Sequence, residues 1–162
     1  MLKNFCYFTN WSPYYQHSNA RFDVRDINVT LCTHLIYAFA GVDVNNLTLS
    51  KTQDSDDDGV PSNKRGRYFV FNNLKLKNPG LKTLLSVGGA TSIASFSHIT
   101  ESDASITKFA RNAAVYLRQR DFDGIDVDWE WPGPTYRNKF SLLLRVRMVL
   151  SFLNYTVCVQ IV

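Results

Sequence analysis

The chain has 162 residues, of which 45 % are hydrophobic and 20 % are charged, and its formal net charge at pH 7 is +4. This length and balance are those of one globular domain with a sizeable core. The lysines and arginines are scattered and form no basic run, so the sequence does not favour nucleic-acid binding. The uncharged part of the apolar tail, 148–162, is shorter than the ~20 residues that cross a bilayer, so no membrane partner is expected.

Strands and helices are expected to alternate along the chain. In chain order we predict a strand at 3–8, a loop with a short helical turn at 11–30, a strand at 33–40, a loop at 45–66, a helix at 67–77, a strand at 81–87, a helix at 102–119, a strand at 122–129, a helix at 136–152 and a possible strand at 155–161. The helix at 102–119 is the clearest, because Ser102 or Asp103 caps it and apolar residues repeat on one face. The alternation predicts an α/β protein with a parallel sheet.

The loop at 45–66 contains an acidic run that imitates the first half of a calcium-binding loop. Asp54, Asp56, Asp58 and Gly59 have the required spacing, but Arg65 stands where the bidentate glutamate belongs. A solvated acidic loop is therefore the expected structure.

Three acids alternate with apolar residues at the end of the predicted strand at 122–129. Asp126, Asp128 and Glu130 share one face of this strand, about 6.6 Å apart along it for a two-residue step. Carboxyls this close in a site poor in water do not all ionise easily, so the pKa of at least one rises toward neutrality. A carboxyl that keeps its proton near pH 7 serves as a general acid. The pattern thus indicates bond-breaking chemistry.

The opposite face of the same strand is apolar. It carries Ile125, Val127 and Trp129, which predicts burial under another layer, while Phe122 and Gly124 are expected on the acid side. Two other interpretations stay open at this point. The acids line a solvated face, or they bind a divalent ion such as magnesium or manganese.

Four motifs in chain order resemble one family. Residues 123–130, Asp-Gly-Ile-Asp-Val-Asp-Trp-Glu, resemble the catalytic strand of the family 18 glycoside hydrolases, which include chitinases and chitinase-like lectins. Residues 6–11, 32–41 and 81–89 resemble the first three barrel strands, the last ending in Ser-x-Gly-Gly. The resemblance runs from about residue 4 to about residue 133.

The resemblance implies an α/β barrel of the TIM type, with the acidic strand as its fourth. A complete barrel of eight units takes ~250 residues. We therefore expect an incomplete TIM barrel made of the first four β/α units and a possible fifth strand. It would form a single domain over 1–162 whose tail, 134–162, diverges from the family.

The resemblance also implies a function. Family members cleave β-1,4-linked N-acetylglucosamine polymers by a retaining, substrate-assisted mechanism, so chitin or a chito-oligosaccharide is the expected partner, without a cofactor or a metal. Glu130 matches the proton donor, and Asp128 matches the residue that orients the acetamido group. Asp126 is expected to share a proton with Asp128, and Asp123 to be structural. The alternatives are a non-catalytic chitin-binding lectin and an inactive truncated relative.

Four residues match family positions that contact the sugar. They are Tyr7, Phe39, Gly89 and Trp131. Aromatic rings at such positions stack on the apolar faces of sugars, and the alternative for each aromatic is core packing. Ala90 departs from the family, which often carries a tryptophan stacking platform directly after Gly-Gly.

Cysteines and glycosylation sequons favour an extracellular protein. The resemblance implies a disulfide between Cys6 and Cys32, and the alternative is two buried thiols. Sequons of the form Asn-x-Ser/Thr begin at Asn10, Asn28, Asn46 and Asn154. Together they predict a secreted protein, although the sequence shows no signal segment before its first strand.

Overall fold

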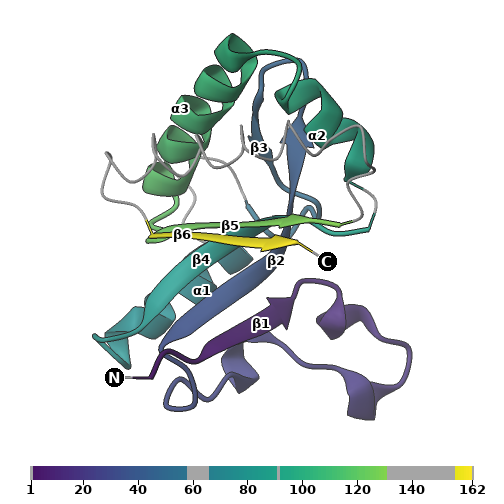
Figure 1. Cartoon of the computed structure of the whole chain (residues 1–162). Helices are drawn as coiled ribbons and strands as arrows, with labels where there is room; N and C mark the ends of the chain where they lie inside the picture. The colour runs from purple at the N-terminus through teal and green to yellow at the C-terminus, as the bar shows by residue number, and fades with distance from the viewer. Residues whose placement is uncertain (1, 58–65, 91, 131–155, 162) are drawn as a thin grey trace.

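A curved parallel sheet organises the chain. The computed structural model describes residues 2–57, 66–90, 92–130 and 156–161 (Figure 1). The sheet order is β1-β2-β4-β5-β6, and every neighbouring pair on this path is parallel. The strands are β1 (Phe5–Thr9), β2 (His34–Asp43), β4 (Lys82–Gly88), β5 (Gly124–Trp129) and β6 (Thr156–Ile161). Figure 1 shows β1 and β2 steeply inclined to β5 and β6, which is the twist expected of a partial barrel.

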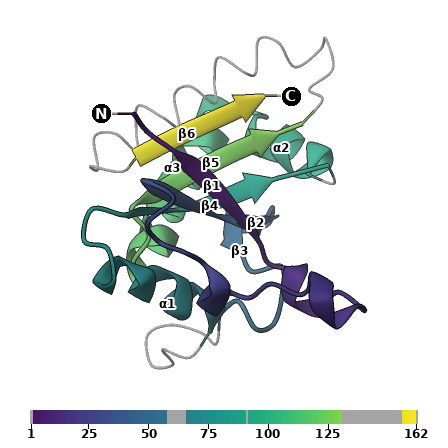
Figure 2. The same ribbon diagram turned by 90° about the horizontal axis from the view of Figure 1, so that it is seen from below.

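Helices follow strands, as the predicted α/β architecture requires. They are α1 (Arg67–Asn72), continued by a 3-10 turn at Asn73–Leu76, α2 (Ile93–Ile99) and α3 (Asp103–Gln119). Buried residues of α1 and α3 form one core with those residues of β2, β4 and β5 that point toward the helices. The fold is therefore the expected incomplete α/β barrel, with helices on its outer face (Figures 1 and 2).

The helix α3 confirms the clearest prediction. The Ser102 side chain accepts a hydrogen bond from the Ser105 amide at 3.0 Å, so Ser102 caps the helix. The predicted apolar face is buried, and it consists of Ile106, Phe109, Ala110, Ala113 and Leu117. The predicted tail strand is also present as β6, whereas the predicted helix at 136–152 lies outside the described residues.

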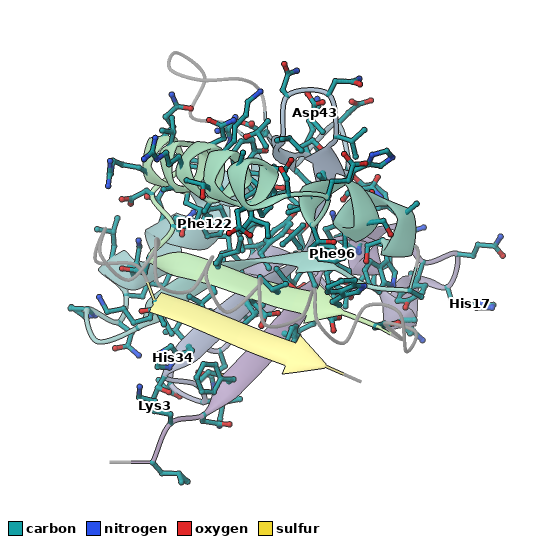
Figure 3. All side chains as sticks on the ribbon, turned by 45° about the horizontal axis from the view of Figure 1, so that its top comes forward. Lys3, His17, His34, Asp43, Phe96 and Phe122 are labelled. Carbon is teal, nitrogen blue, oxygen red and sulfur yellow. A yellow bond between two sulfur atoms is a disulfide. The ribbon has the colours of Figure 1, made fainter. Side chains whose placement is uncertain are left out.

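The start of β5 corrects one expectation. The strand begins at Gly124 rather than at 122, and Phe122 lies on the helix side of the sheet instead of the acid side. Its ring centroid is 5.3 Å from that of Tyr68; the Phe122 side chain is labelled in Figure 3. The Phe122 amide still donates to the Leu117 carbonyl of α3, so this residue belongs to the helix-ending turn. Strand alternation does not apply to it.

Two short elements were not predicted. The helix α2 follows β4, and Phe96 on it stacks on Trp129 with ring centroids 5.1 Å apart (Figure 3). The strand β3 (Thr48–Ser50) pairs antiparallel with the extended end of β2. Both are short and depend on tertiary contacts rather than on a strong local pattern.

The acidic loop is not fully solvated, which corrects another expectation. Asp56 is 0 % exposed and accepts hydrogen bonds from the side chains of Tyr37 and Asn10. Its burial depends on residues from β2 and from the end of β1, which the local acidic pattern does not report.

The predicted disulfide is present. It joins Cys6 of β1 to Cys32, just before β2, with Cα atoms 6.0 Å apart. It ties together the first two strands near their start. Within the part of the chain that the structure describes, no helix is long and apolar enough to cross a membrane.

Candidate active site

The carboxylates of β5 lie on the inner face of the sheet. Ile125, Val127 and Trp129 belong to the core shared with the helices, so the side chains of Asp126 and Asp128 point to the other side. Asp126 is 0 % exposed and Asp128 is 7 % exposed, which rules out a solvated face for these two acids. Glu130 follows the last residue of β5 and is partly buried.

Hydroxyl groups from two other strands support the Asp126 carboxylate. The Ser86 hydroxyl of β4 donates to Asp126 Oδ2 at 2.7 Å, and the Tyr7 hydroxyl of β1 donates to the same oxygen at 3.1 Å. Ser86 lies directly opposite Asp126 in the strand register. Hydrogen bonds from two hydroxyls fix the position of this buried acid.

The surroundings of Asp128 favour its protonated form. Burial raises its pKa above the ordinary value, and the nearby charges of Glu130 and Asp126 raise it further. Among the described residues, no group donates a hydrogen bond to its buried Oδ1. The pattern predicted a raised pKa for at least one acid of this set, and the direction of the shift at Asp128 agrees with it.

Two glycines let β4 approach Asp128 closely. Gly88 lies opposite Asp128 in the register, and the Gly89 amide donates to the Asp128 carbonyl at 2.9 Å. A Cβ atom on Gly88 would overlap that carbonyl, and the φ angles of the two glycines are +139° and +81°. The close backbone approach beside the acid therefore requires glycine at 88, and the positive φ favours glycine at 89.

A pocket of about 380 Å³ opens at the carboxyl ends of β1, β2 and β4. Trp11 and Phe39 line it with their rings stacked at 6.0 Å between centroids and 22° between planes. Gly89 also lines the pocket, and a Cβ there would meet the Phe39 ring at 3.1 Å. Gly88 and Gly89 form the boundary between this pocket and Asp128.

The structure places most of the sequence-predicted residues in this region. Phe39 and Gly89 line the pocket, and Tyr7 lies on the inner face in contact with Asp126. Trp131 lies outside the described residues. Asn10 and Thr52 line the pocket and were not predicted as site residues. The signal for Asn10 was a polar residue directly after a strand, whereas no local signal identified Thr52.

Asp123 lies apart from this face and acts as a link between strands. Its carboxylate accepts from the Thr83 amide at 2.9 Å and pairs with Lys75 and Lys82, each at 3.3 Å. Burial raises the pKa of Asp123, but the Thr83 amide and the two lysines lower it by more, so its net shift is downward. This environment suits the structural role expected for it.

The metal-binding interpretation has no geometric support in the residues that the structure describes. No three histidine, cysteine, aspartate or glutamate side chains among them are grouped closely enough to hold an ion.

Comparison with known proteins identifies the family. The model of glycosyl hydrolases family 18 matches residues 3–151 of the chain. The chain belongs to this family. Chitotriosidase-1 of Mus musculus is 40 % identical to the family 18 chain over 146 residues, which are 86 % of this chain and 29 % of the mouse protein.

Solved structures of family 18 relatives have the same fold. The Group IV chitinase of Ostrinia furnacalis in complex with allosamidin matches with a TM-score of 0.83 and 33 % identity, over 97 % of this chain and 43 % of that one. Human YKL-39, a pseudo-chitinase with retained chitooligosaccharide binding properties, matches with a TM-score of 0.82 and 30 % identity, over 98 % and 43 %. The family 18 chain thus spans less than half of each of these solved proteins.

Proposed function

We propose that this family 18 chain carries the proton-transfer centre of a chitinase-type hydrolase that acts on β-1,4-linked N-acetylglucosamine polymers. The observation that carries the proposal is the buried pair of Asp126 and Asp128 on the inner face, followed by Glu130. Chitin or a chito-oligosaccharide is the proposed ligand. The ring pair of Trp11 and Phe39 offers a surface on which a sugar stacks.

In the proposed mechanism, Glu130 gives its proton to the glycosidic oxygen while the C1–O bond breaks. The acetamido oxygen of the substrate bonds to C1 in place of an enzyme carboxylate, so the family is an exception to the two-carboxylate scheme. Water then attacks C1, the bond between C1 and the acetamido oxygen breaks, and Glu130 takes up one proton from the water, so the configuration at C1 is retained.

The environments of Asp126 and Asp128 support their proposed roles. Asp128, with its raised pKa, orients the acetamido group in its protonated form and, as an anion, balances the positive charge of the cyclic intermediate. Asp126 is held by Ser86 and Tyr7 and exchanges a proton with Asp128. When a proton moves from Asp128 to Asp126, Asp128 becomes an anion beside the positively charged cyclic intermediate.

A binding function without turnover is the second candidate. The pseudo-chitinase YKL-39 shows that family members exist which bind chito-oligosaccharides without being chitinases. Ala90 also stands directly after the Gly-Gly pair, where a larger stacking residue would widen the contact with sugar. The presence of Glu130 favours the hydrolase.

Hydrolysis of a fluorogenic chitobioside tests the proposal. Because the chain spans less than half of its solved relatives, we expect only weak release by the 162-residue chain, and we expect that release to be lost in Glu130→Gln and kept in Glu101→Gln. Glu101 is a matched control because its exposed side chain pairs only with His98 among the interactions described for it. Release that persists in Glu130→Gln would remove the proposed role of Glu130. Binding of chitotetraose without release would support the second candidate, and release abolished by a chelator would support a metal site.

We further propose that the protein is secreted. The Cys6–Cys32 disulfide supports this proposal, because such bonds persist mainly in oxidising compartments. Expression of the complete gene product in a eukaryotic host, with assay of cells and medium, tests it. Recovery only from the cells would contradict the proposal.

A further inference from the structure

Asp56 is a buried acid that the proposed mechanism does not use. It lies in the loop between β3 and α1 and is 0 % exposed. Its Oδ1 accepts from the Tyr37 hydroxyl at 2.5 Å, and its Oδ2 accepts from Asn10 Nδ2 at 2.8 Å and from the Gln53 amide at 3.0 Å. One carboxylate thus joins β2, the end of β1 and its own loop.

The bond to Asn10 leads from Asp56 to the pocket wall. Asn10 Nδ2 also donates to Thr52 Oγ1 at 2.8 Å and to the Phe39 carbonyl at 3.3 Å. Thr52 Oγ1 in turn donates to the same Phe39 carbonyl at 2.6 Å. The backbone of Phe39 is therefore held by two side chains, and one of them is oriented by Asp56.

Phe39 and the residue after Asn10 form the ring pair of the pocket. The backbone N–H of Asn10 donates to the Ala38 carbonyl of β2 at 2.7 Å. Asn10 therefore bonds to Ala38 through its main chain and to the next residue, Phe39, through its side chain. Trp11 follows Asn10 and stacks on Phe39. Asp56 itself does not line the pocket, but three residues that depend on it do. Asp56 bonds directly to Asn10 and Gln53, and it reaches Thr52 through Asn10.

We propose that Asp56 is a positioning residue that sets the geometry of the Trp11–Phe39 pair and, through it, the affinity of the pocket for a chito-oligosaccharide. The sugar part of this statement rests on the proposed function. The geometric part does not, because it concerns only contacts within the chain.

A carboxylate is required here because it only accepts hydrogen bonds. Tyr37, Asn10 and the Gln53 amide all donate to it, and the three donors use both oxygens. An asparagine has nearly the same shape, but it is uncharged and offers only one acceptor oxygen. If its NH₂ group faces the partners of Oδ2, the bonds from Asn10 and Gln53 are lost together. If it faces the Tyr37 hydroxyl, which can also accept, those two bonds remain but lose their charge assistance. Asp56→Asn is therefore a nearly isosteric test of this network.

The experiment compares Asp56→Asn with Asp54→Asn. Asp54 is in the same loop, but its side chain is fully exposed and its pairing with Lys51 is at the surface. Chitotetraose affinity is measured by calorimetry, and the Trp11 indole signal is followed by ¹H–¹⁵N NMR without ligand, assigned with Trp11→Phe. We expect Asp56→Asn to weaken binding about tenfold and to shift the indole signal, as loss of a charge-assisted hydrogen bond predicts. Asp54→Asn should change neither.

Tyr37→Phe separates positioning from general stability. It removes the bond to Oδ1 and leaves the Oδ2 bonds to Asn10 and Gln53, so it should lower the melting temperature with little change in affinity or indole shift. Equal changes in Asp56→Asn and Tyr37→Phe would overturn the proposal, and so would an unchanged indole signal in Asp56→Asn. If Asp56→Asn does not fold, Asn10→Ala replaces it in the experiment. An unchanged Trp11 indole signal in Asn10→Ala would also overturn the proposal. Absence of chitotetraose binding by the wild-type chain refutes the proposed function alone, because the indole measurement still decides the positioning role.

Discussion

The Tyr7 hydroxyl on β1 donates to Asp126 Oδ2 on β5 at 3.1 Å, across 119 residues of sequence. Two strands, β2 and β4, lie between β1 and β5 in the sheet. In a flat sheet β1 and β5 would be about 14 Å apart, too far for this bond. The contact therefore requires the sheet to curl, and it brings Tyr7 of the first strand to Asp126 on the fourth strand of the sheet path.

The two hydroxyls on Asp126 should differ in their contribution to stability. Ser86 is fully buried, so water does not take the place of its hydroxyl in Ser86→Ala, and the loss of its bond to Asp126 should cost about 1–3 kcal/mol in the free energy of unfolding. Tyr7 is 41 % exposed, so water replaces its hydroxyl in Tyr7→Phe and the cost should be below about 1 kcal/mol. Urea denaturation measures both. A larger cost for Tyr7→Phe would mean that water does not reach this side of Asp126.

The raised pKa of Asp128 predicts a pH-dependent effect of Asp128→Asn. The folded chain binds a proton at Asp128 more readily than the unfolded chain, so this acid lowers the stability of the fold progressively as pH rises above its ordinary value of 3.8. Asp128→Asn should therefore be more stable than the wild type at pH 7, and the difference should shrink as pH falls toward 4. Melting temperatures of both proteins between pH 4 and 7 test this.

Asp123→Asn provides the comparison of opposite sign. The pKa of Asp123 is lowered in the fold, so its negative charge stabilises the fold at pH values above the ordinary pKa of 3.8. This stabilisation is lost as the pH falls through the lowered pKa. The variant should be less stable than the wild type at pH 7, and the deficit should decrease in acid. A difference with the same sign for both variants would contradict these two environments.

Gly88→Ala should damage the fold beside the acid. A Cβ at this position overlaps the Asp128 carbonyl, and the φ of +139° is unfavourable for alanine. We expect a loss of about 2–6 kcal/mol from strain and overpacking. Gly80→Ala is the control, because the nearest atom to its Cβ would be Asn78 Oδ1 at an ordinary 3.5 Å. Chemical denaturation compares the two, and equal stabilities would contradict the close approach of β4 to β5.

The Cys6–Cys32 disulfide should stabilise the chain through its closed loop. The two cysteines are 26 residues apart, for which the chain-entropy estimate gives roughly 3 kcal/mol. Cys6→Ser/Cys32→Ser should lower the urea midpoint accordingly. Dithiothreitol should lower the midpoint of the wild type in the same way and leave the double variant unchanged. A response of the double variant to dithiothreitol would point to Cys158, the third cysteine of the sequence.

The sequence by itself determined the acid face and the helix α3. In both, the pattern repeats within a single element, so the residues that alternate with the acids report which side faces the core. Ile125, Val127 and Trp129 predicted a buried outer face, and the structure has it. The motifs also predicted the barrel and the disulfide, because the family resemblance carries long-range information that local patterns lack.

Only the tertiary structure decided the surroundings of the loops. Asp56 has the sequence context of a solvated acid, yet Tyr37 and Asn10, which lie 19 and 46 residues away, enclose it. Phe122 has the spacing of a strand residue, yet the turn that ends α3 directs it toward Tyr68. The physical reason is that burial of a residue outside a regular element depends on which distant segments pack over it, and no local period encodes that.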